Sequence, residues 1–370
     1  MWNFKMPVTI RFGYDCVQQL NALPELQGCR TMIASDARLA STPAVAKIIA
    51  DLPNVGVFME IEPNPTVESV DALAAQLRAN NANALVAIGG GSVMDCAKAA
   101  AVLATSDADT IRLFHTGGRP VPATSIPMIA IPTTAGTGSE VTPFAVLDDR
   151  THGTKAPIGG NALYPTVALI DPRLTESLPL SVTAASGLDA LAHCMEGYWS
   201  INHQPICDAL AIEGARLVFT HLETAMLEPG NREAREQMAY AALLGGMAFQ
   251  LPKNAIVHAC SFPLSQQAHL SHGAACAFTL EFALRLNAPV MEGRMEYFAN
   301  ACGFATIEEM AQRIRHLKKT GGMPITLKDA GIAAEQVPAL IAGCTHPLMK
   351  NNPVTVTKEI LEQLFVELAG

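Results

Sequence analysis

ALVAIGGGSVMDCAK, residues 84–98, is the stretch that decides the fold. Its first five residues form an apolar run typical of a buried strand, and its second half predicts a helix that carries Asp95 and Lys98. Small residues fill the turn between them: Gly89, Gly90, Gly91 and Ser92. Glycines let the backbone approach a ligand, and a helix N-terminus offers free N–H groups to a phosphate. The turn is a candidate pyrophosphate site, or else a flexible strand-to-helix turn, because the chain lacks GxGxxG.

Similar apolar, β-prone runs recur on both sides of this stretch, separated by longer helical segments. They are RTMIAS (30–35), VGVFMEI (55–61), ALVAIGG (84–90), PMIAIPTT (127–134) and TVALIDP (166–172). Strands that alternate with helices imply a parallel sheet with helices on its faces. We therefore predict an α/β domain with a Rossmann-like sheet over residues 1–179.

The sequence pattern changes after about Pro179. β-branched runs become rare, while Ala, Leu, Met and Glu follow a 3.6-residue period, as in residues 207–226 and 235–249. We predict an all-helical domain over residues 180–370. Two domains also agree with the length of the chain, which exceeds that of one compact core.

Composition excludes several classes of function. Hydrophobic residues make up 49% of the chain and charged residues 16%, which argues against disorder. The net charge of −9 and the lack of Lys/Arg runs argue against nucleic acid or an anionic membrane as partner. Nine scattered cysteines without a CxxC pair suit a reducing cytoplasm, and no export signal or membrane span is visible. A small-molecule substrate and a cytoplasmic location are expected.

A second loop rich in glycine and threonine follows the apolar run at 127–132. Its small and hydroxyl-bearing residues are Thr133, Thr134, Gly136, Thr137, Gly138 and Ser139. Open α/β sheets bind ligands at the carboxyl ends of their strands, so two such loops suit a dinucleotide. Asp36 ends another strand, where a carboxylate can bind the ribose diol of NAD and repel the 2′-phosphate of NADP, or can cap a turn.

The helical half contains candidate metal ligands. Asp189 and His193 stand four residues apart in AASGLDALAHCMEGYWS (184–200), which places both on one helix face. Residues 256–278 add His258, His269 and His272. Carboxylate and imidazole ligands suit Zn²⁺ or Fe²⁺, although each histidine alone is more often a core or surface residue. Neighbouring cysteines at 194, 260 and 276 are interpreted as small packing residues.

These motifs together resemble the iron-containing, or group III, alcohol dehydrogenases. GGGSVMDCAK, IPTTAGTGSEVT, GLDALAHCMEGY, His258 and the HG at 272–273 occur in the order typical of that family. The resemblance implies the dehydroquinate synthase-like fold, a Rossmann-like domain followed by a helical domain, and in many members a homodimer. It further implies NAD(P) and one divalent ion, Fe²⁺ or Zn²⁺, held by Asp189, His193, His258 and His272.

The resemblance also assigns residues to the cofactor. Asp36 is expected at the ribose, which favours NAD(H) over NADP(H), and Gly89 to Ser92 at the pyrophosphate. Thr133 to Thr137 are expected around the nicotinamide end, and Lys155 near the cofactor. We add Asp95 and Ser139, which lie in the same two motifs, to the expected cofactor site.

One position departs from the family pattern. Members with HxxxHP carry a second histidine four residues after the ligand that corresponds to His258, whereas this chain has Phe262 there. A proton relay must then use other groups or water. The string KNAIVHACSFPL, with Lys253 before the histidine and an aromatic residue before the proline, resembles the phosphonoacetaldehyde reductases. We expect Lys253 to bind a phosphonate, or alternatively to extend into solvent, and Phe262 to shape a small pocket.

The predicted reaction is the interconversion of a small primary alcohol and its aldehyde, with phosphonoacetaldehyde as a candidate substrate. One rival is a lyase similar to dehydroquinate synthase, which uses NAD and zinc without net oxidation. Its polyanionic substrate would demand several basic residues near the metal, and these segments contain chiefly Lys253. The other rival is a non-catalytic metal or nucleotide sensor.

Overall fold

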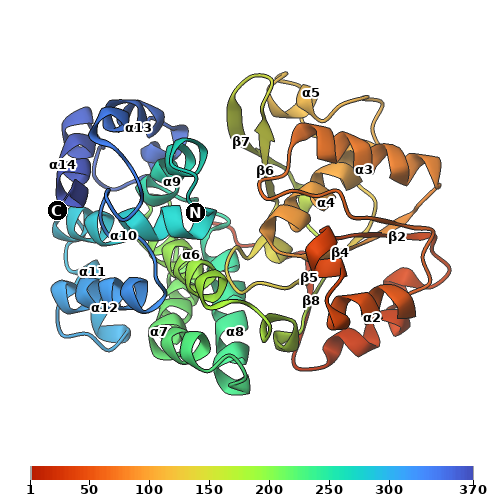
Figure 1. Cartoon of the computed structure of the whole chain (residues 1–370), viewed down its shortest axis with the longest axis horizontal. Helices are drawn as coiled ribbons and strands as arrows, with labels where there is room; N and C mark the ends of the chain where they lie inside the picture. Colours follow the sequence, from red (N-terminus) through yellow and green to blue (C-terminus); the bar gives the residue numbers. More distant parts are fainter. Residues whose placement is uncertain (1, 370) are drawn as a thin grey trace. The chain divides into compact units, whose positions relative to one another are not determined.

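The structure is a computed structural model that describes residues 2–369, and the chain forms two compact units (Figure 1). The α/β unit comprises Lys5–Thr134 and Ser139–Glu176. The helical unit comprises Met1–Phe4, Ala135–Gly138 and Ser177–Gly370. Among the described residues, no helix is long and apolar enough to cross a membrane.

A six-stranded, all-parallel sheet forms the centre of the α/β unit, with the order β1-β8-β5-β4-β2-β3. The strands are β1 (Thr9–Phe12), β2 (Thr31–Ala34), β3 (Gly56–Phe58), β4 (Ala84–Gly89), β5 (Met128–Pro132) and β8 (Val167–Ile170). Each of the five apolar runs in the sequence contains one of these strands, so the predicted parallel sheet is confirmed. β1 was not predicted.

The central strands of this sheet are buried on both faces, which explains why β4, β5 and β8 are apolar throughout instead of alternating with polar residues. In β4, Leu85 and Ala87 pack on one side of the sheet, while Val86 and Ile88 pack on the other. The helices of this unit are α1 (Ala37–Ala40), α2 (Pro43–Asp51), α3 (Val67–Ala79), α4 (Gly91–Ala104) and α5 (Arg112–His115). Leu73 of α3 and Val102 of α4 belong to the first of the two cores.

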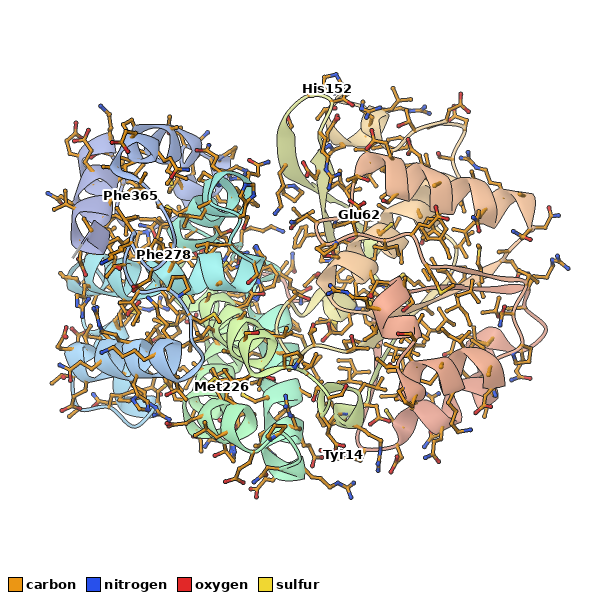
Figure 2. The ribbon with its side chains drawn as sticks, in the orientation of Figure 1. Tyr14, Glu62, His152, Met226, Phe278 and Phe365 are labelled. Carbon is orange, nitrogen blue, oxygen red and sulfur yellow. The ribbon has the colours of Figure 1, made fainter. Side chains whose placement is uncertain are left out.

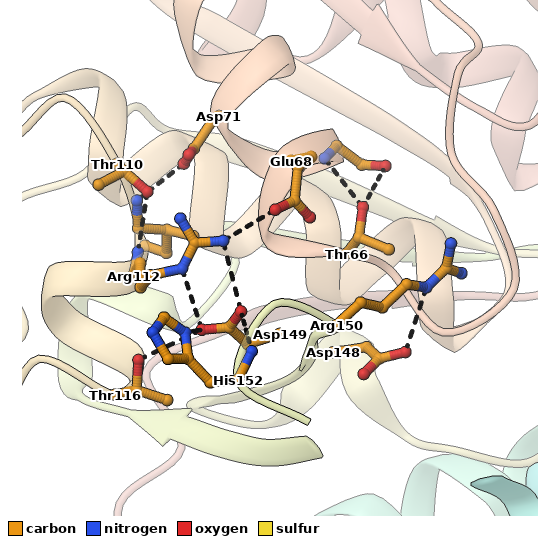
Figure 3. Close-up of polar contacts among 12 residues, drawn as sticks. Thr66, Glu68, Asp71, Thr110, Arg112, Thr116, Asp148, Asp149, Arg150 and His152 are labelled. Atoms are coloured by element: carbon orange, nitrogen blue, oxygen red, sulfur yellow. Dashed lines mark hydrogen bonds and ion pairs between the residues drawn. The ribbon is translucent and has the colours of Figure 1, made fainter. Parts of the chain in front are cut away.

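An antiparallel hairpin of β6 (Phe144–Asp149) and β7 (Thr154–Gly159) completes the α/β unit. At its turn, the fully buried Asp149 accepts hydrogen bonds from Arg112 at 3.0 Å and from His152 at 2.8 Å (Figure 3). Burial alone would raise the pKa of Asp149, but these two partners hold that pKa well below its usual range. The carboxylate therefore stays charged and ties the hairpin to α5.

Within the described residues the helical unit contains nine α-helices, in agreement with the helical periodicity after Pro179. They are α6 (Leu180–Trp199), α7 (Pro205–Leu227), α8 (Arg232–Phe249), α9 (Ile256–Gln267), α10 (His272–Asn287), α11 (Arg294–Ala301), α12 (Ile307–Thr320), α13 (Val337–Gly343) and α14 (Lys358–Ala369). One apolar core joins them and includes Met226, Phe278 and Phe365, which come from three different helices (Figure 2). This core holds α6, α9 and α10, the three helices that carry the candidate metal ligands.

Candidate functional site

Helix α6 carries a buried polar stripe. Asp189, His193 and Glu196 stand at positions i, i+4 and i+7, so all three lie on one face of the helix. Their exposed fractions are only 2%, 3% and 0%. Polar groups are this strongly buried only where they have partners or bind a ligand. The rest of the helix is apolar or small and packs into the core of the helical unit.

Glu196 fixes the orientation of His258, which projects from α9. The Nδ1–H of His258 donates to Glu196 Oε2 at 2.5 Å, and the backbone N–H of Val257 donates to Glu196 Oε1 at 2.7 Å. The bond at Nδ1 leaves Nε2 of His258 directed at Asp189 Oδ1, 3.6 Å away. Glu196 was not predicted from the sequence, although the helical stripe that begins at Asp189 and His193 contains it.

His272 begins α10 and reaches the same carboxylate, with its Nε2 3.6 Å from Asp189 Oδ1. The next residue, Gly273, explains how α10 comes so close to α6. A Cβ atom at this position would lie 2.1 Å from the carbonyl oxygen of Ala185, which is far inside contact distance. The glycine of the HG pair is therefore required by packing, and this packing brings His272 to the site.

Cys276 lies one turn beyond His272, with its Sγ 3.9 Å from His272 Nε2. One ligand atom from each of Asp189, His258, His272 and Cys276 fits within a set whose members all lie within 4.8 Å of one another. We had interpreted Cys276 as a packing residue, but the structure places it among the candidate ligands. Burial would raise the pKa of Cys276, but His258 and His272 lower it.

These residues suit a divalent cation. Three buried atoms of this cluster have no hydrogen-bond partner among residues 2–369: Asp189 Oδ1, His193 Nδ1 and His258 Nε2. Burial alone would raise the pKa of Asp189, but the three surrounding imidazoles hold it well below its usual range. Burial lowers the pKa of His193 to about 3, so this ring stays neutral and keeps a lone pair for a metal. Buried polar atoms without a partner are costly in free energy unless they bind an ion.

His193 is held by its neighbours in a different way from the other imidazoles. Its ring stacks on Phe249 at a centroid distance of 4.2 Å and on His258 at 4.5 Å. Residues 256–278 contain two further candidate histidines. His269 is exposed in the turn between α9 and α10, whereas His272 belongs to the cluster. The structure therefore brings all four predicted metal ligands to one region of the helical unit.

Phe262 lies on α9 one turn after His258 and is buried. Its ring contacts the imidazole of His346 at a centroid distance of 4.7 Å. His346 Nδ1 accepts the backbone N–H of Leu348 at 3.2 Å, so the neutral ring carries its proton on Nε2. The structure makes His346 the imidazole that contacts Phe262.

Lys253 is half-buried in the loop between α8 and α9, with φ 69°. Its ammonium donates to the carbonyl of Gln250 at 2.8 Å, and burial lowers its pKa to about 8. The side chain of Asn351 binds the carbonyl of the following residue, Asn254, at 2.8 Å. This hydrogen bond joins the loop that carries Lys253 to the segment of residues 350–352.

In the α/β unit, the predicted cofactor loops meet at the carboxyl ends of adjacent strands. β4 pairs with β5 in parallel register, and Gly89 lies opposite Pro132. A Cβ atom on Gly90 would lie 3.3 Å from the side chain of Thr134, and the N–H of Thr133 donates to the carbonyl of Gly89. The N-terminus of α4, which begins at Gly91, lies at the same edge. This is the edge at which open parallel sheets bind nucleotides.

Two other predicted cofactor residues are joined through Asn64. Lys155 donates to Asn64 Oδ1 at 2.9 Å, and the N–H of Asn64 donates to Ser92 Oγ at 3.1 Å. Sequence reasoning missed Asn64, whose only local signal is its place in an NP turn. Asp36 lies just after β2 and caps α1, because its Oδ1 accepts the N–H of Leu39 at 2.9 Å. The capping role that we had left open is therefore real.

Asp95 and Ser139 belong to a network of hydrogen bonds within the α/β unit. Ser139 Oγ donates to Asp95 Oδ1 at 2.6 Å, and Asp95 Oδ2 accepts the N–H of Val146 at 2.8 Å. The buried ammonium of Lys98 donates to the carbonyl of Ser139 at 2.8 Å. These bonds tie α4 to the loop after β5. Thr137, the remaining predicted cofactor residue, belongs to the helical unit and not to the α/β unit.

A parallel α/β unit with ligand-binding loops, together with a helical unit that carries a buried carboxylate and imidazole cluster, defines the class of metal-dependent nucleotide enzymes. Comparisons with known proteins identify the family. The model described as "Iron-containing alcohol dehydrogenase" matches residues 7–172, and that of the C-terminal part of the Fe-containing alcohol dehydrogenase family matches residues 183–369. The chain belongs to the iron-containing alcohol dehydrogenase family and is an oxidoreductase that acts on CH–OH groups.

Individual relatives are similar over nearly their whole length. A 1-propanol dehydrogenase of Salmonella typhimurium is 34% identical, over 91% of this chain and 92% of its own. A sulfoacetaldehyde reductase of Bilophila wadsworthia is 30% identical, over 92% and 91%. The crystal structure of a sulfoacetaldehyde reductase from Bifidobacterium kashiwanohense in complex with NAD⁺ is 41% identical and has a TM-score of 0.95, covering 100% of this chain and 99% of that one.

Proposed function

We propose that this enzyme reduces a two-carbon aldehyde with an anionic head, a sulfonate or a phosphonate, to the corresponding alcohol with NADH. The position of Lys253 is the observation that supports an anionic head on the substrate. It is a half-buried cation five residues before the candidate ligand His258. Phosphonoacetaldehyde, which the sequence favoured, and sulfoacetaldehyde, on which two relatives act by name, share this chemistry. One ammonium balances one negative charge, so the sulfonate is the better match of the two.

The metal centre is proposed as Asp189, His193, His258 and His272, with either Fe²⁺ or Zn²⁺. A divalent ion there would supply a Lewis acid that polarises the substrate's oxygen. Phe249 covers one face of His193, and Glu196 sets the tautomer of His258. These contacts hold the ligands in place before substrate arrives, which is how residues that contact the ligands contribute to metal sites.

Proton transfer differs here from that in relatives with a histidine at the position of Phe262. A phenyl ring cannot exchange protons, so Phe262 cannot act as a proton relay. The proton needed by the alcohol product must come from water or another group. His346 contacts Phe262, and its Nε2 carries the proton of the neutral ring. Burial lowers the pKa of His346, and the Leu348 N–H occupies its other nitrogen, so His346 is suited to donate a hydrogen bond and poorly suited to become charged.

The cofactor is proposed to be NAD(H), bound by the loops at Gly89 to Ser92 and Thr133 to Thr137, with Asp36 and Lys155 beside them. The pyrophosphate would accept hydrogen bonds from the N-terminus of α4. The nicotinamide exchanges a hydride with the carbon of the substrate. NAD⁺ in the Bifidobacterium structure supports this choice of cofactor.

Asp36→Asn tests the cofactor preference. The amide keeps an oxygen for the Leu39 N–H, so the cap of α1 survives while the negative charge is lost. We expect the ratio of kcat/KM for NADH over NADPH to fall by roughly tenfold or more, on the order of 1.4 kcal/mol. Steady-state kinetics with both cofactors measures it, and Asp51→Asn, at an exposed surface ion pair, is the control. A wild type that already prefers NADPH contradicts the assignment.

Lys253→Asn tests the substrate class. Asparagine tolerates the positive φ of this position, so the backbone is kept while the charge is removed. A charge pair with a desolvated anion contributes a few kcal/mol, so kcat/KM for the anionic aldehyde should fall roughly a hundredfold. Propanal, which is neutral, should be affected little.

Kinetics of wild type, Lys253→Asn and the surface control Lys358→Ala are compared on sulfoacetaldehyde, phosphonoacetaldehyde and propanal. The values of kcat/KM for sulfoacetaldehyde and phosphonoacetaldehyde show which of the two anions the enzyme prefers. Equal losses on propanal and on the anions would contradict the role of Lys253. A wild type that turns over only propanal would contradict the anionic substrate.

A further inference from the structure

We propose that Cys276 is an additional ligand of the metal centre, bound through its sulfur beside Asp189, His258 and His272. The inference rests on the metal centre of the proposed function and adds to it a thiolate. Its first support is position. Cys276 lies four residues after His272 on α10, so both side chains project from one face of the helix.

The distances around Cys276 are close to those of a ligand set. Its Sγ lies 3.9 Å from His272 Nε2, and the four ligand atoms all lie within 4.8 Å of one another. Two atoms that bind a common ion at about 2.0 to 2.3 Å are separated by less than twice that length, so small side-chain movements close the set on an ion. Cys276 is completely buried, so its sulfur is not exposed to solvent.

A second observation is independent of the cysteine. Asp189 Oδ1 and His258 Nε2 belong to side chains that are 2% and 3% exposed, and neither atom has a hydrogen-bond partner among the described residues. Both residues belong to the same set as Cys276. An ion at their common centre would satisfy the two unpaired atoms and would have the sulfur in reach.

Cys194, another cysteine near the site, does not share this geometry. Cys194 follows His193 directly, but its sulfur faces α7 and α8, where a Cβ atom on Gly214 would lie 2.6 Å from it and one on Gly245 would lie 3.3 Å from it. Cys194 is also completely buried in a helix. It is therefore a matched control for Cys276.

Binding through Cys276 has a chemical consequence. The thiol must lose its proton to solvent when the metal binds, because only the thiolate is a strong ligand. A thiolate adds a soft donor to a set of oxygen and nitrogen ligands, and soft donors favour zinc over iron. This cysteine would shift the selectivity of the site toward Zn²⁺.

Cobalt substitution tests the inference, because Co²⁺ reports its ligands by colour. The metal-free protein is titrated with Co²⁺, and the absorption spectra of wild type, Cys276→Ser and Cys194→Ser are recorded. We expect visible ligand-field bands in all three proteins. A near-ultraviolet band from sulfur-to-cobalt charge transfer should appear in wild type and in Cys194→Ser and be lost in Cys276→Ser. Circular dichroism checks that each variant is folded.

The affinity for Zn²⁺ supplies a second measurement. Competition with a coloured chelator should give a Kd for Cys276→Ser that is roughly tenfold or more above that of wild type. Cys276→Asp, which offers a carboxylate instead, should keep cobalt bound but without the charge-transfer band. Ligand-field bands without a charge-transfer band in wild type would overturn the role of Cys276 alone. Failure of wild type to bind any cobalt would overturn the metal centre itself, and the inference with it.

Discussion

His258→Ala is expected to lose the metal and nearly all turnover while the protein stays folded. His258 Nε2 is one of three buried atoms that a metal would satisfy, and its ring lies between Glu196 and Asp189. Lewis-acid stabilisation by a metal contributes several kcal/mol, so turnover should fall by roughly a thousandfold or more. Glu196 keeps the N–H of Val257 as a partner at 2.7 Å, so its carboxylate is not left without any donor.

Metal content by elemental analysis, kcat and the circular dichroism spectrum are measured on this variant. His269→Ala is the control, because His269 is an exposed histidine in the turn between α9 and α10. The control should keep about one metal ion per chain and full activity. Full activity in a His258→Ala protein shown to be free of metal would contradict the proposed centre.

Most of the sheet was predictable because β2, β4, β5 and β8 are fully buried. Continuous apolar runs ending in small residues mark β2, β4, β5 and β8 without any long-range information. β1 was missed because it has four residues and is only partly buried, so it lacks a continuous apolar run. The β6–β7 hairpin was missed because its polar anchor, Asp149, depends on Arg112, 37 residues earlier in the chain.

The candidate site was predictable only in part. The spacing of Asp189 and His193 marks one helix face from local sequence alone. His258 and His272 come from two other helices, and their inclusion depended on the family resemblance, because no local pattern links them to α6. Their ligand role stays a prediction. Cys276 was missed because a cysteine among small residues looks the same whether it packs or binds, and only the three-dimensional distances separate these cases.

Asp36 illustrates a different limit of sequence reasoning. A carboxylate at the end of a strand suits both a ribose and a helix cap, and the structure shows the cap. The cap does not exclude the ribose, because one carboxylate oxygen is engaged and a carboxylate has a second. The sequence could raise both roles, and only kinetics with the two cofactors tests the second.

Glu196→Ala is expected to weaken metal binding and to destabilise the fold together. The change leaves two buried donors without their acceptor, the Nδ1–H of His258 and the N–H of Val257. Each unsatisfied donor costs about 1 to 3 kcal/mol, so the free energy of unfolding should fall by about 2 to 6 kcal/mol. The loss of a carboxylate that orients a metal-binding histidine should raise the Kd for Zn²⁺ by roughly a hundredfold.

Two measurements separate positioning from a merely structural role of Glu196. Urea unfolding of the metal-free variants gives the stability, and chelator competition at a temperature where all variants are folded gives the Kd for Zn²⁺. Glu196→Gln should lie between wild type and Glu196→Ala in both, because the two donors bind different carboxylate oxygens and the amide replaces one of these oxygens with an NH2 group that cannot accept. Glu281→Gln, at a buried ion pair with Lys318 away from the cluster, should lower stability and leave the Kd unchanged. If Glu196→Ala also left the Kd unchanged, Glu196 would stabilise the fold without orienting His258 for the metal.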